Sequence, residues 1–450
     1  MTLFPGYGDF LKLAVSADPE NVAFIQELLS IWEVTWVSPE DSDVVIVYRR
    51  KPLEASKKTI LIPSDSMHFE NWVRHSECTV AKRVGKPISV AATPAINLSF
   101  TPEALYDVKP SNCAMCEDLV IPQLDFVKEY KRILRQTLTS GASVTYRLAT
   151  SLPLPYNIAP KRLRDYLMKK YGERSRLNLY DVLPIDALRF ALAHAIQKLL
   201  KEKFRRKTWD HRSSVCVLTH DVDTREGLRK SRNVKKLEEE YDLPSVWFVP
   251  SKQYTLDCEI VEELENNGEV GSHDTKHDGR LSRLSKRKLT ERLMEGKSDL
   301  ESVTNRPVEG FRAPLLQHTS KILSALRECG FKYDTSIPTW EPKHPRTMCP
   351  HGIGTLFPML IEGMNEIPIT IMQDHQLLHV LCLTPKETIA EWLSDITMIK
   401  ELGGICVFLS HPEYGLLDTQ GLPFYEELLN TIVSDHELLG ASMNRVLRSD

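Results

Sequence analysis

The chain contains one decisive stretch, Val215-Cys216-Val217-Leu218-Thr219-His220-Asp221-Val222-Asp223, in which a run of small and β-branched apolar residues stops at two carboxylates. Such a run predicts a buried parallel strand that emerges at its carboxyl end. Because side chains alternate along a strand, Asp221 and Asp223 are expected to point the same way. Two like charges that close repel each other, so the pair is expected to keep a proton or to bind a cation. A turn or helix cap after the strand is the alternative interpretation, since Asp suits both.

From this stretch to the end of the chain, predicted strands alternate with predicted helices. The strands are expected at 215–219, 244–249, 268–272, 308–311, 331–335, 365–371 and 405–410, and helices at 228–241, 285–303 and 384–402. The last helix opens with Thr384-Pro385-Lys386-Glu387, a capping box with Pro at the first helical position. Repeated β-α units imply parallel strands and right-handed crossovers. We therefore expect an α/β fold, a distorted (β/α)7 barrel with its chemistry at the carboxyl ends of the strands.

Two further regions precede the predicted barrel domain, which is expected at 213–450. At 450 residues, two or three domains are the prior expectation. Residues 1–125 predict a small α/β domain of unknown role, with a helix at 21–34 and strands at 44–48, 59–62 and 88–91. Residues 126–212 predict a helical connector with two main helices, at 125–138 and 184–203.

The composition is that of an ordinary globular protein, with 42% hydrophobic and 26% charged residues. A net charge of −4 implies no strong nucleic-acid or anionic-membrane partner. The sequence shows no signal-peptide pattern and no apolar run of about 18 residues, so we expect a cytoplasmic protein without a membrane span. The nine cysteines are odd in number, and several lie in apolar contexts, which fits reduced thiols. Whether the chain forms a homo-oligomer stays open.

One candidate metal site lies in the N-terminal region. His75-x2-Cys78 and Cys113-x2-Cys116 offer four nitrogen and sulfur ligands in two pairs, which is the composition of a structural zinc site. The alternative is ordinary reduced cysteines, because such spacings also arise by chance. The sequence leaves both interpretations open.

A second candidate metal site follows the predicted strand at 268–272, where the chain continues His273-Asp274-Thr275-Lys276-His277. Two imidazoles four residues apart can meet one metal from a helical turn or a tight loop. Two histidines and one carboxylate, with open positions for water, form a catalytic metal set. The alternative is a pair of hydrogen-bonded surface histidines.

Two more residues stand at strand ends. Arg312 lies just past the predicted strand at 308–311, where it is positioned to pair with a strand-end carboxylate. His411 follows the last predicted strand, where an imidazole can act as a general acid.

These stretches, in this order, resemble the NodB-type polysaccharide deacetylases, a carbohydrate esterase family, over about residues 213–440. The matching motifs are Thr219-His220-Asp221-Val222-Asp223, His273-x3-His277, Arg312-x-Pro314 and Leu409-x-His411-Pro412. The resemblance implies that a divalent metal, with zinc as the expected ion, is held by Asp223, His273 and His277. It also implies that Asp221 is the general base, that His411 is the general acid and that Arg312 holds Asp221.

The same resemblance implies that Leu409 lines a pocket for an acetyl methyl group and that the N–H after Pro314 supports an oxyanion. The sequence departs from the family pattern where Val222 separates the two aspartates and where Leu315 replaces an aromatic residue. The family's Asp–Trp motif is also altered, because Trp340 follows Thr339. Two residues are candidates for orienting His411, namely Asp334 and Asp374.

The predicted function is a metal-dependent hydrolase that removes an N-acetyl group from an acetylated amino sugar or a surface-glycan precursor made inside the cell. One alternative is hydrolysis of a non-sugar C–N bond, such as that of a cyclic amide. The other alternative is a catalytically silent glycan-binding protein. The presence of base, acid and metal ligands together argues against a silent protein, since a binding module does not need them.

Overall fold

The computed structural model describes residues 11–48, 58–62, 113–116, 119–122, 125–140, 183–201, 205–339 and 352–448. The chain divides into two compact units. The first consists of Met1–Ile133 and Leu177–Lys207, and the second of Leu134–Arg176 and Thr208–Asp450. The predicted boundaries at residues 125 and 212 stay predictions.

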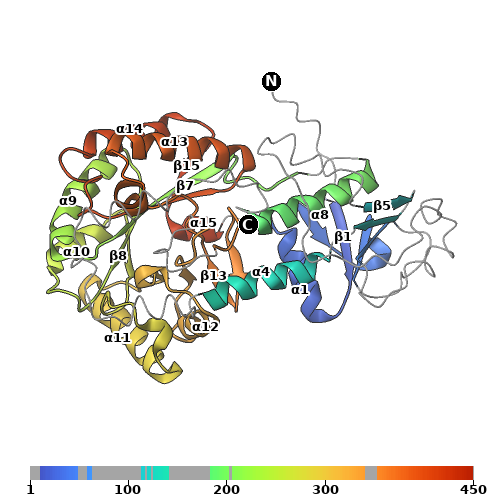
Figure 1. Ribbon diagram of the computed structural model, residues 1–450, viewed down its shortest axis with the longest axis horizontal. Helices are drawn as coiled ribbons and strands as arrows, with labels where there is room; N and C mark the ends of the chain where they lie inside the picture. Colours follow the sequence, from blue (N-terminus) through green and yellow to red (C-terminus); the bar gives the residue numbers. More distant parts are fainter. Residues whose placement is uncertain are drawn as a thin grey trace. The chain divides into compact units, whose positions relative to one another are not determined.

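The first unit is built on a mainly parallel sheet with the strand order β2-β1-β3-β4-β6-β5 (Figure 1). Its strands are β1 (Leu11–Ser16), β2 (Val34–Trp36), β3 (Val44–Tyr48), β4 (Thr59–Ile62), the antiparallel β5 (Cys113–Cys116) and β6 (Leu119–Pro122). The helices α1 (Pro19–Leu28) and α8 (Pro184–Leu200) contact each other, and α8 also contacts β4 and β6. All five residues of β3 are buried, so this strand forms the centre of the apolar core.

The predicted strands at 44–48 and 59–62 are confirmed, but the helix predicted at 21–34 was too long. It ends at Leu28, and Val34–Trp36 instead pairs in parallel with β1. Val, Thr and Trp favour extended structure, and this tertiary pairing overrides the helical spacing of the apolar residues. The predicted strand at 88–91 and the candidate ligands His75 and Cys78 lie outside the described residues.

The second unit contains a sheet with the strand order β12-β13-β11-β10-β9-β8-β7-β14, and β15 pairs with the start of β7. Within the described residues, the seven strands from β13 to β14 in this order each pair in parallel with the next. The bounds are β7 (Ser214–Asp221), β8 (Ser245–Val249), β9 (Glu269–Ser272), β10 (Gly310–Phe311), β11 (Tyr333–Asp334), β12 (Met359–Ile361), β13 (Met364–Glu366), β14 (Ile405–Ser410) and β15 (Leu438–Gly440). The predicted α/β barrel of seven parallel strands is confirmed, although the sequence did not predict β12 and β15.

The curled sheet stays open at one seam in the described part of the chain. There the segment after β13 approaches β14, and the Ile371 N–H donates to the Val407 carbonyl at 3.3 Å. Every residue of β7 is buried, because this strand pairs with β8 on one side and with β14 on the other. The sheet thereby brings the carboxyl ends of strands far apart in sequence to one end of the barrel.

Helices pack around the sheet of the second unit (Figure 1). They are α9 (Arg225–Glu240), α10 (Cys258–Glu265), α11 (Lys286–Thr304), α12 (Ser320–Glu328), α13 (Pro385–Leu402), α14 (Leu422–Ser434) and α15 (Met443–Arg448). A further helix, α4 (Phe126–Ser140), precedes α8 in the chain. Short helical turns occur at Pro39–Asp41, Leu281–Arg283, Pro314–Leu316 and Gln376–Val380. The capping box predicted for α13 is present, with Thr384 and Glu387 bonded reciprocally. Among the described helices, none combines the length and the apolar character needed to cross a bilayer.

Candidate active site

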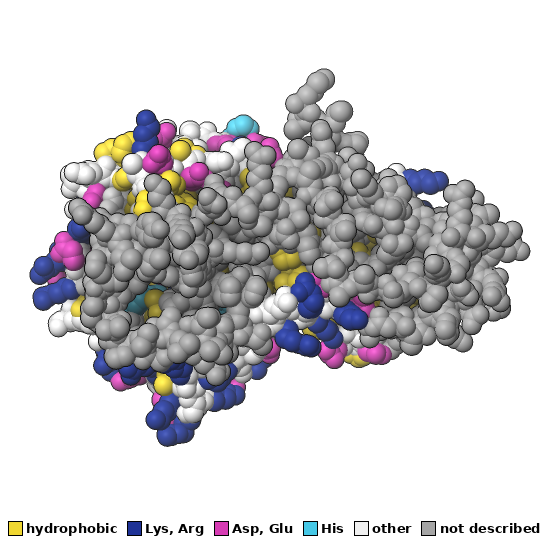
Figure 2. Space-filling view, viewed as in Figure 1, with side chains coloured by type: hydrophobic (Ala, Val, Ile, Leu, Met, Phe, Trp, Pro, Cys, Tyr) yellow, Lys and Arg dark blue, Asp and Glu magenta, His cyan; other side chains and the backbone are white. Residues whose placement is uncertain are grey.

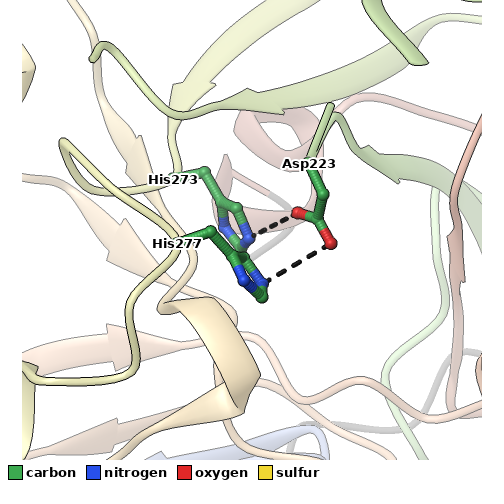
Figure 3. A group of neighbouring side chains, drawn as sticks. All are labelled: Asp223, His273 and His277. Atoms are coloured by element: carbon green, nitrogen blue, oxygen red, sulfur yellow. Dashed lines mark ion pairs between the residues drawn. The ribbon is translucent and has the colours of Figure 1, made fainter. Parts of the chain in front are cut away.

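The ends of β7 and β9 bring three predicted metal ligands together. Asp223 lies two residues past β7, and His273 follows β9 directly. The Nε2 atom of His273 lies 3.3 Å from Oδ1 of Asp223, and the Nε2 atom of His277 lies 3.5 Å from Oδ2 (Figure 3). The three ligand atoms all lie within 4.8 Å of one another. One cation is therefore able to touch all three side chains.

The loop between the two histidines is clamped by an arginine that the sequence analysis did not single out. Asp274 adopts a left-handed backbone conformation with φ of 66°. Arg292, on α11, donates from Nε and Nη2 to the two carboxylate oxygens of Asp274, at 2.7 and 2.6 Å. Its Nη2 also donates to the Lys276 carbonyl at 2.8 Å. This bidentate contact fixes the loop so that both imidazoles face Asp223.

The orientation of His273 is set by the backbone of β10. Its Nδ1 lies 2.8 Å from the Arg312 carbonyl oxygen. A carbonyl only accepts, so Nδ1 carries the proton in the neutral ring and Nε2 is left as a ligand toward Asp223. Burial opposes ionisation of Asp223, but His277 and His273 outweigh it and hold the pKa of Asp223 well below its usual value.

Unpaired atoms in this cluster test whether a cation fits. Oδ1 of Asp223 and Nε2 of His273 are buried, and neither has a hydrogen-bond partner among the described residues. Buried polar atoms without a partner are costly, so native structures almost always satisfy them. Two imidazole nitrogens and a carboxylate oxygen are a ligand set that zinc accepts, with a position left for water. The residues present therefore fit a divalent cation.

Asp221 is held by a fully buried arginine. Nη1 of Arg312 donates to Oδ1 of Asp221 at 3.0 Å and to Oγ1 of Thr219 at 2.8 Å. Nε of Arg312 donates to the Thr335 carbonyl at 3.0 Å, and the guanidinium lies 4.4 Å from the centre of the Phe248 ring. The second oxygen of Asp221 lies 3.8 Å from Nε2 of His273, so it faces the cluster.

His411 pairs with Asp374 rather than with Asp334. Nδ1 of His411 lies 2.7 Å from Oδ1 of Asp374, and the His411 N–H donates to Oδ2 at 2.8 Å. Its Nε2 faces the cluster, 3.9 Å from Oδ2 of Asp223. Burial lowers the pKa of His411, but the Asp374 charge outweighs it and, with Asp223 and Asp221, raises the pKa to about 10. The structure thus chooses between the two aspartates that the sequence left open.

Apolar and aromatic side chains surround these polar groups. Leu409 packs with Leu316 and Ile369 in a buried apolar cluster. Leu315 and Leu316 both have positive φ, 58° and 53°, which is rare for leucine and concentrates at functional sites. The Tyr414 ring, also missed by the sequence analysis, lies 4.6 Å from that of His411.

The fold and the site define a class: an α/β barrel with an Asp–His–His cluster, an Asp–Arg pair and a His–Asp pair at its strand ends. Residues 209–333 match the family model described as polysaccharide deacetylase, which confirms the resemblance predicted from the motifs. The matched segment contains Asp221, Asp223, His273, His277 and Arg312, whereas His411 lies beyond it. Among curated proteins, none matches the chain.

Solved structures resemble about half of the chain. A Mycobacterium smegmatis protein assigned to the polysaccharide deacetylases is 18% identical, covers 52% of this chain and 89% of its own, and has a TM-score of 0.45. An allantoinase is 11% identical, and the match covers 53% of this chain and 90% of the allantoinase, with a TM-score of 0.41. A pseudoenzyme from Bacillus anthracis is 14% identical, with coverages of 53% and 66% and a TM-score of 0.37. At these identities and scores, the similarities carry no argument about the reaction.

Proposed function

We propose that the protein is a metal-dependent hydrolase that removes the N-acetyl group from an acetylated amino sugar or a surface-glycan precursor. One observation carries the proposal: the Asp223–His273–His277 cluster lies between a fixed carboxylate, Asp221, and a fixed imidazole, His411. The match of residues 209–333 to the polysaccharide deacetylase family supports the same reaction class. The expected ion is zinc, which would be held by the three residues of the cluster.

When bound there, a zinc ion supplies Lewis-acid polarisation of the amide carbonyl and makes a water molecule more acidic. Asp221 is the proposed base. Its Oδ1 is occupied by Arg312, which leaves Oδ2 to accept the proton of the attacking water. Because Arg312 cannot leave its hydrogen bonds to Thr219 and Thr335 without losing buried contacts, the base keeps one orientation.

His411 is the proposed general acid. Asp374 accepts from Nδ1, so the proton that His411 donates is the one on Nε2, which faces the cluster. An amine is a poor leaving group unless its nitrogen is protonated as the C–N bond breaks. Asp221 gains one proton from water and His411 loses one to the amine, and the products are a free amino sugar and acetic acid, which ionises to acetate in water.

The remaining parts of the site suit an acetyl group. Leu409, Leu316 and Ile369 offer an apolar surface for the methyl group. The backbone N–H of Leu315 is the proposed donor to the developing oxyanion. We also propose that the substrate is a precursor made in the cytoplasm, which accords with five free cysteines among the described residues.

The test combines metal content with product analysis. Purified protein, loaded with zinc, is incubated with acetylated amino sugars, nucleotide-linked acetyl sugars and acetylated glycan oligomers. Acetate release that stops on chelation and returns with zinc supports the proposal. Ammonia or a ring-opened product from cyclic amides would support the C–N alternative. Tight glycan binding without any product would support the silent binding protein.

A further inference from the structure

Two buried carboxyl groups lie side by side on neighbouring strands of the sheet in the second unit. Asp334, on β11, and Glu366, on β13, are register partners in neighbouring parallel strands. Both side chains are 0% exposed. Two adjacent buried carboxylates repel each other strongly, so this arrangement requires compensation.

Each of the two carboxyl groups has a hydrogen bond to only one of its oxygens among the residues that the structure describes. Oδ1 of Asp334 accepts from the Ser336 hydroxyl at 2.6 Å, and Oε1 of Glu366 accepts from the Ile337 N–H at 2.9 Å. The second oxygens, Oδ2 and Oε2, are buried, and the described part of the chain offers them no hydrogen-bond partner. A single proton between these two oxygens satisfies both and removes one of the two charges.

Hydrogen bonds connect the carboxyl pair to the segment of Arg312, the arginine that holds Asp221. Ser336 accepts from the backbone N–H of Ala313, the residue after Arg312, at 2.8 Å. Thr335, between Asp334 and Ser336, accepts from Nε and Nη2 of Arg312, at 3.0 and 3.2 Å. Ser336 thus contacts both Asp334 and the segment that carries the guanidinium, and its neighbour Thr335 contacts the guanidinium itself.

We propose that Asp334 and Glu366 hold one proton between them, and that their single negative charge is a second counter-charge that positions Arg312 against Asp221. Both are positioning residues, since neither touches the reacting atoms. The positioning role rests on the proposed function, whereas the shared proton does not. One buried guanidinium is then balanced by Asp221 on one side and by the acid pair on the other.

The local charges agree with one retained proton. Burial raises the pKa of Asp334 to about 6 and that of Glu366 well above its usual value, and Arg312 opposes both shifts. His318 lies beside Ser336, but burial lowers its pKa to about 4, so it adds no charge at neutral pH. The positive charge of Arg312 lowers the pKa of both carboxyls.

Charge-conserving and charge-removing variants separate the alternatives. Glu366→Gln leaves Asp334 as the one carboxylate, so the charge near Arg312 is unchanged. The double change Asp334→Asn with Glu366→Gln removes that charge. The NMR resonance of the Arg312 Nε–H is expected to stay in place for the single variant and to shift for the double variant, because only the double variant removes the second counter-charge. Glu362→Gln, in the exposed turn before β13, is the matched control and moves nothing.

Infrared spectroscopy tests the proton without any substrate. The wild type is expected to keep a protonated-carboxyl band at pH 7.5 that Glu366→Gln abolishes and Glu362→Gln retains. Absence of the band in the wild type would overturn the shared proton. An Arg312 Nε–H resonance that shifts in the single variant, or stays fixed in the double variant, would overturn the counter-charge. If the wild type releases no acetate, the Nε–H resonance of Arg312, followed in the same variants, decides the positioning role separately from the proposed function.

Discussion

Two buried histidines at the same end of the barrel have opposite surroundings. His220, in β7, has both ring nitrogens bonded, Nδ1 to the Ser410 hydroxyl at 2.9 Å and Nε2 to Glu238 at 2.8 Å. Its ring also stacks on Trp247, with centroids 4.0 Å apart. His273, directly after β9, has Nδ1 fixed by a carbonyl, but its Nε2 finds no hydrogen-bond partner within the described ranges.

The comparison shows that residue type alone does not mark a site. A hydroxyl, an imidazole and a carboxylate contact one another in sequence here, as in a nucleophilic triad, and they belong to Ser410, His220 and Glu238. All three residues are at most 1% exposed, so no substrate reaches the hydroxyl. That cluster ties β7 to β14 and α9, and its imidazole is already satisfied. At His273 an unsatisfied nitrogen faces a carboxylate with an unsatisfied oxygen, and this pair of unpaired atoms indicates a ligand.

The largest expected effect separates the two histidines. His273→Ala removes a nitrogen ligand, so bound zinc is expected to fall to background and acetate release by about 1000-fold or more. Metal analysis and product assay on the purified variant measure both. The matched change, His220→Gln, is expected to retain zinc while the free energy of unfolding falls by about 2–4 kcal/mol, because buried hydrogen bonds are lost. Equal zinc loss in both variants would remove the distinction between the clusters.

A second change tests which carboxylate belongs to the metal. Asp221→Asn keeps the size of the side chain but removes the proposed base, so turnover is expected to fall by about 100- to 10,000-fold. Zinc content should match that of the wild type, since the proposed ligand is Asp223. Loss of zinc from Asp221→Asn, with zinc retained by Asp223→Asn, would show that the two roles are exchanged.

A smaller effect is expected for Arg292, which contacts the loop between the two histidines but not the metal site itself. Arg292→Gln removes the bidentate clamp on Asp274 without touching either imidazole. Zinc affinity is expected to fall by about 10- to 100-fold, as for other groups that orient metal ligands. Competition with a fluorescent chelator measures the affinity, and Arg287→Gln, an exposed pair with Glu291 on the same helix, is the control. An unchanged affinity would mean that the loop holds its conformation without the clamp.

The sequence predicted the features that depend on local pattern. Apolar runs that end in polar residues predicted the parallel strands, because such strands are buried on both faces and their ends face solvent. The spacing of His273 and His277 predicted that both would reach one ion, and the position of Arg312 predicted its pairing with a strand-end carboxylate. The chemical roles of these residues stay predictions that the variants above test.

Long-range contacts were beyond the sequence. Asp374 begins the helical segment that runs into the turn at Gln376–Val380, 37 residues before His411, and no periodicity distinguishes it from Asp334 as a partner. Arg292 belongs to an amphipathic helix, where a charged residue is ordinary and its contact with Asp274 leaves no signature. His220 and Glu238 likewise occupy a strand and a helix whose packing alone makes them partners. Each contact depends on tertiary placement rather than on spacing.

The smallest expected effect concerns Tyr425, the outermost member of the His220 cluster. The Tyr425 hydroxyl donates to Oε1 of Glu238 at 2.6 Å, the same oxygen that faces His220. Tyr425→Phe removes this bond but keeps the ring, so the free energy of unfolding is expected to fall by about 1–2 kcal/mol. Zinc affinity and the pH profile should stay as in the wild type, because the cluster is structural. Denaturant unfolding and metal titration measure the two quantities, and a tenfold loss of zinc affinity without loss of stability would show that the buried cluster serves the site directly.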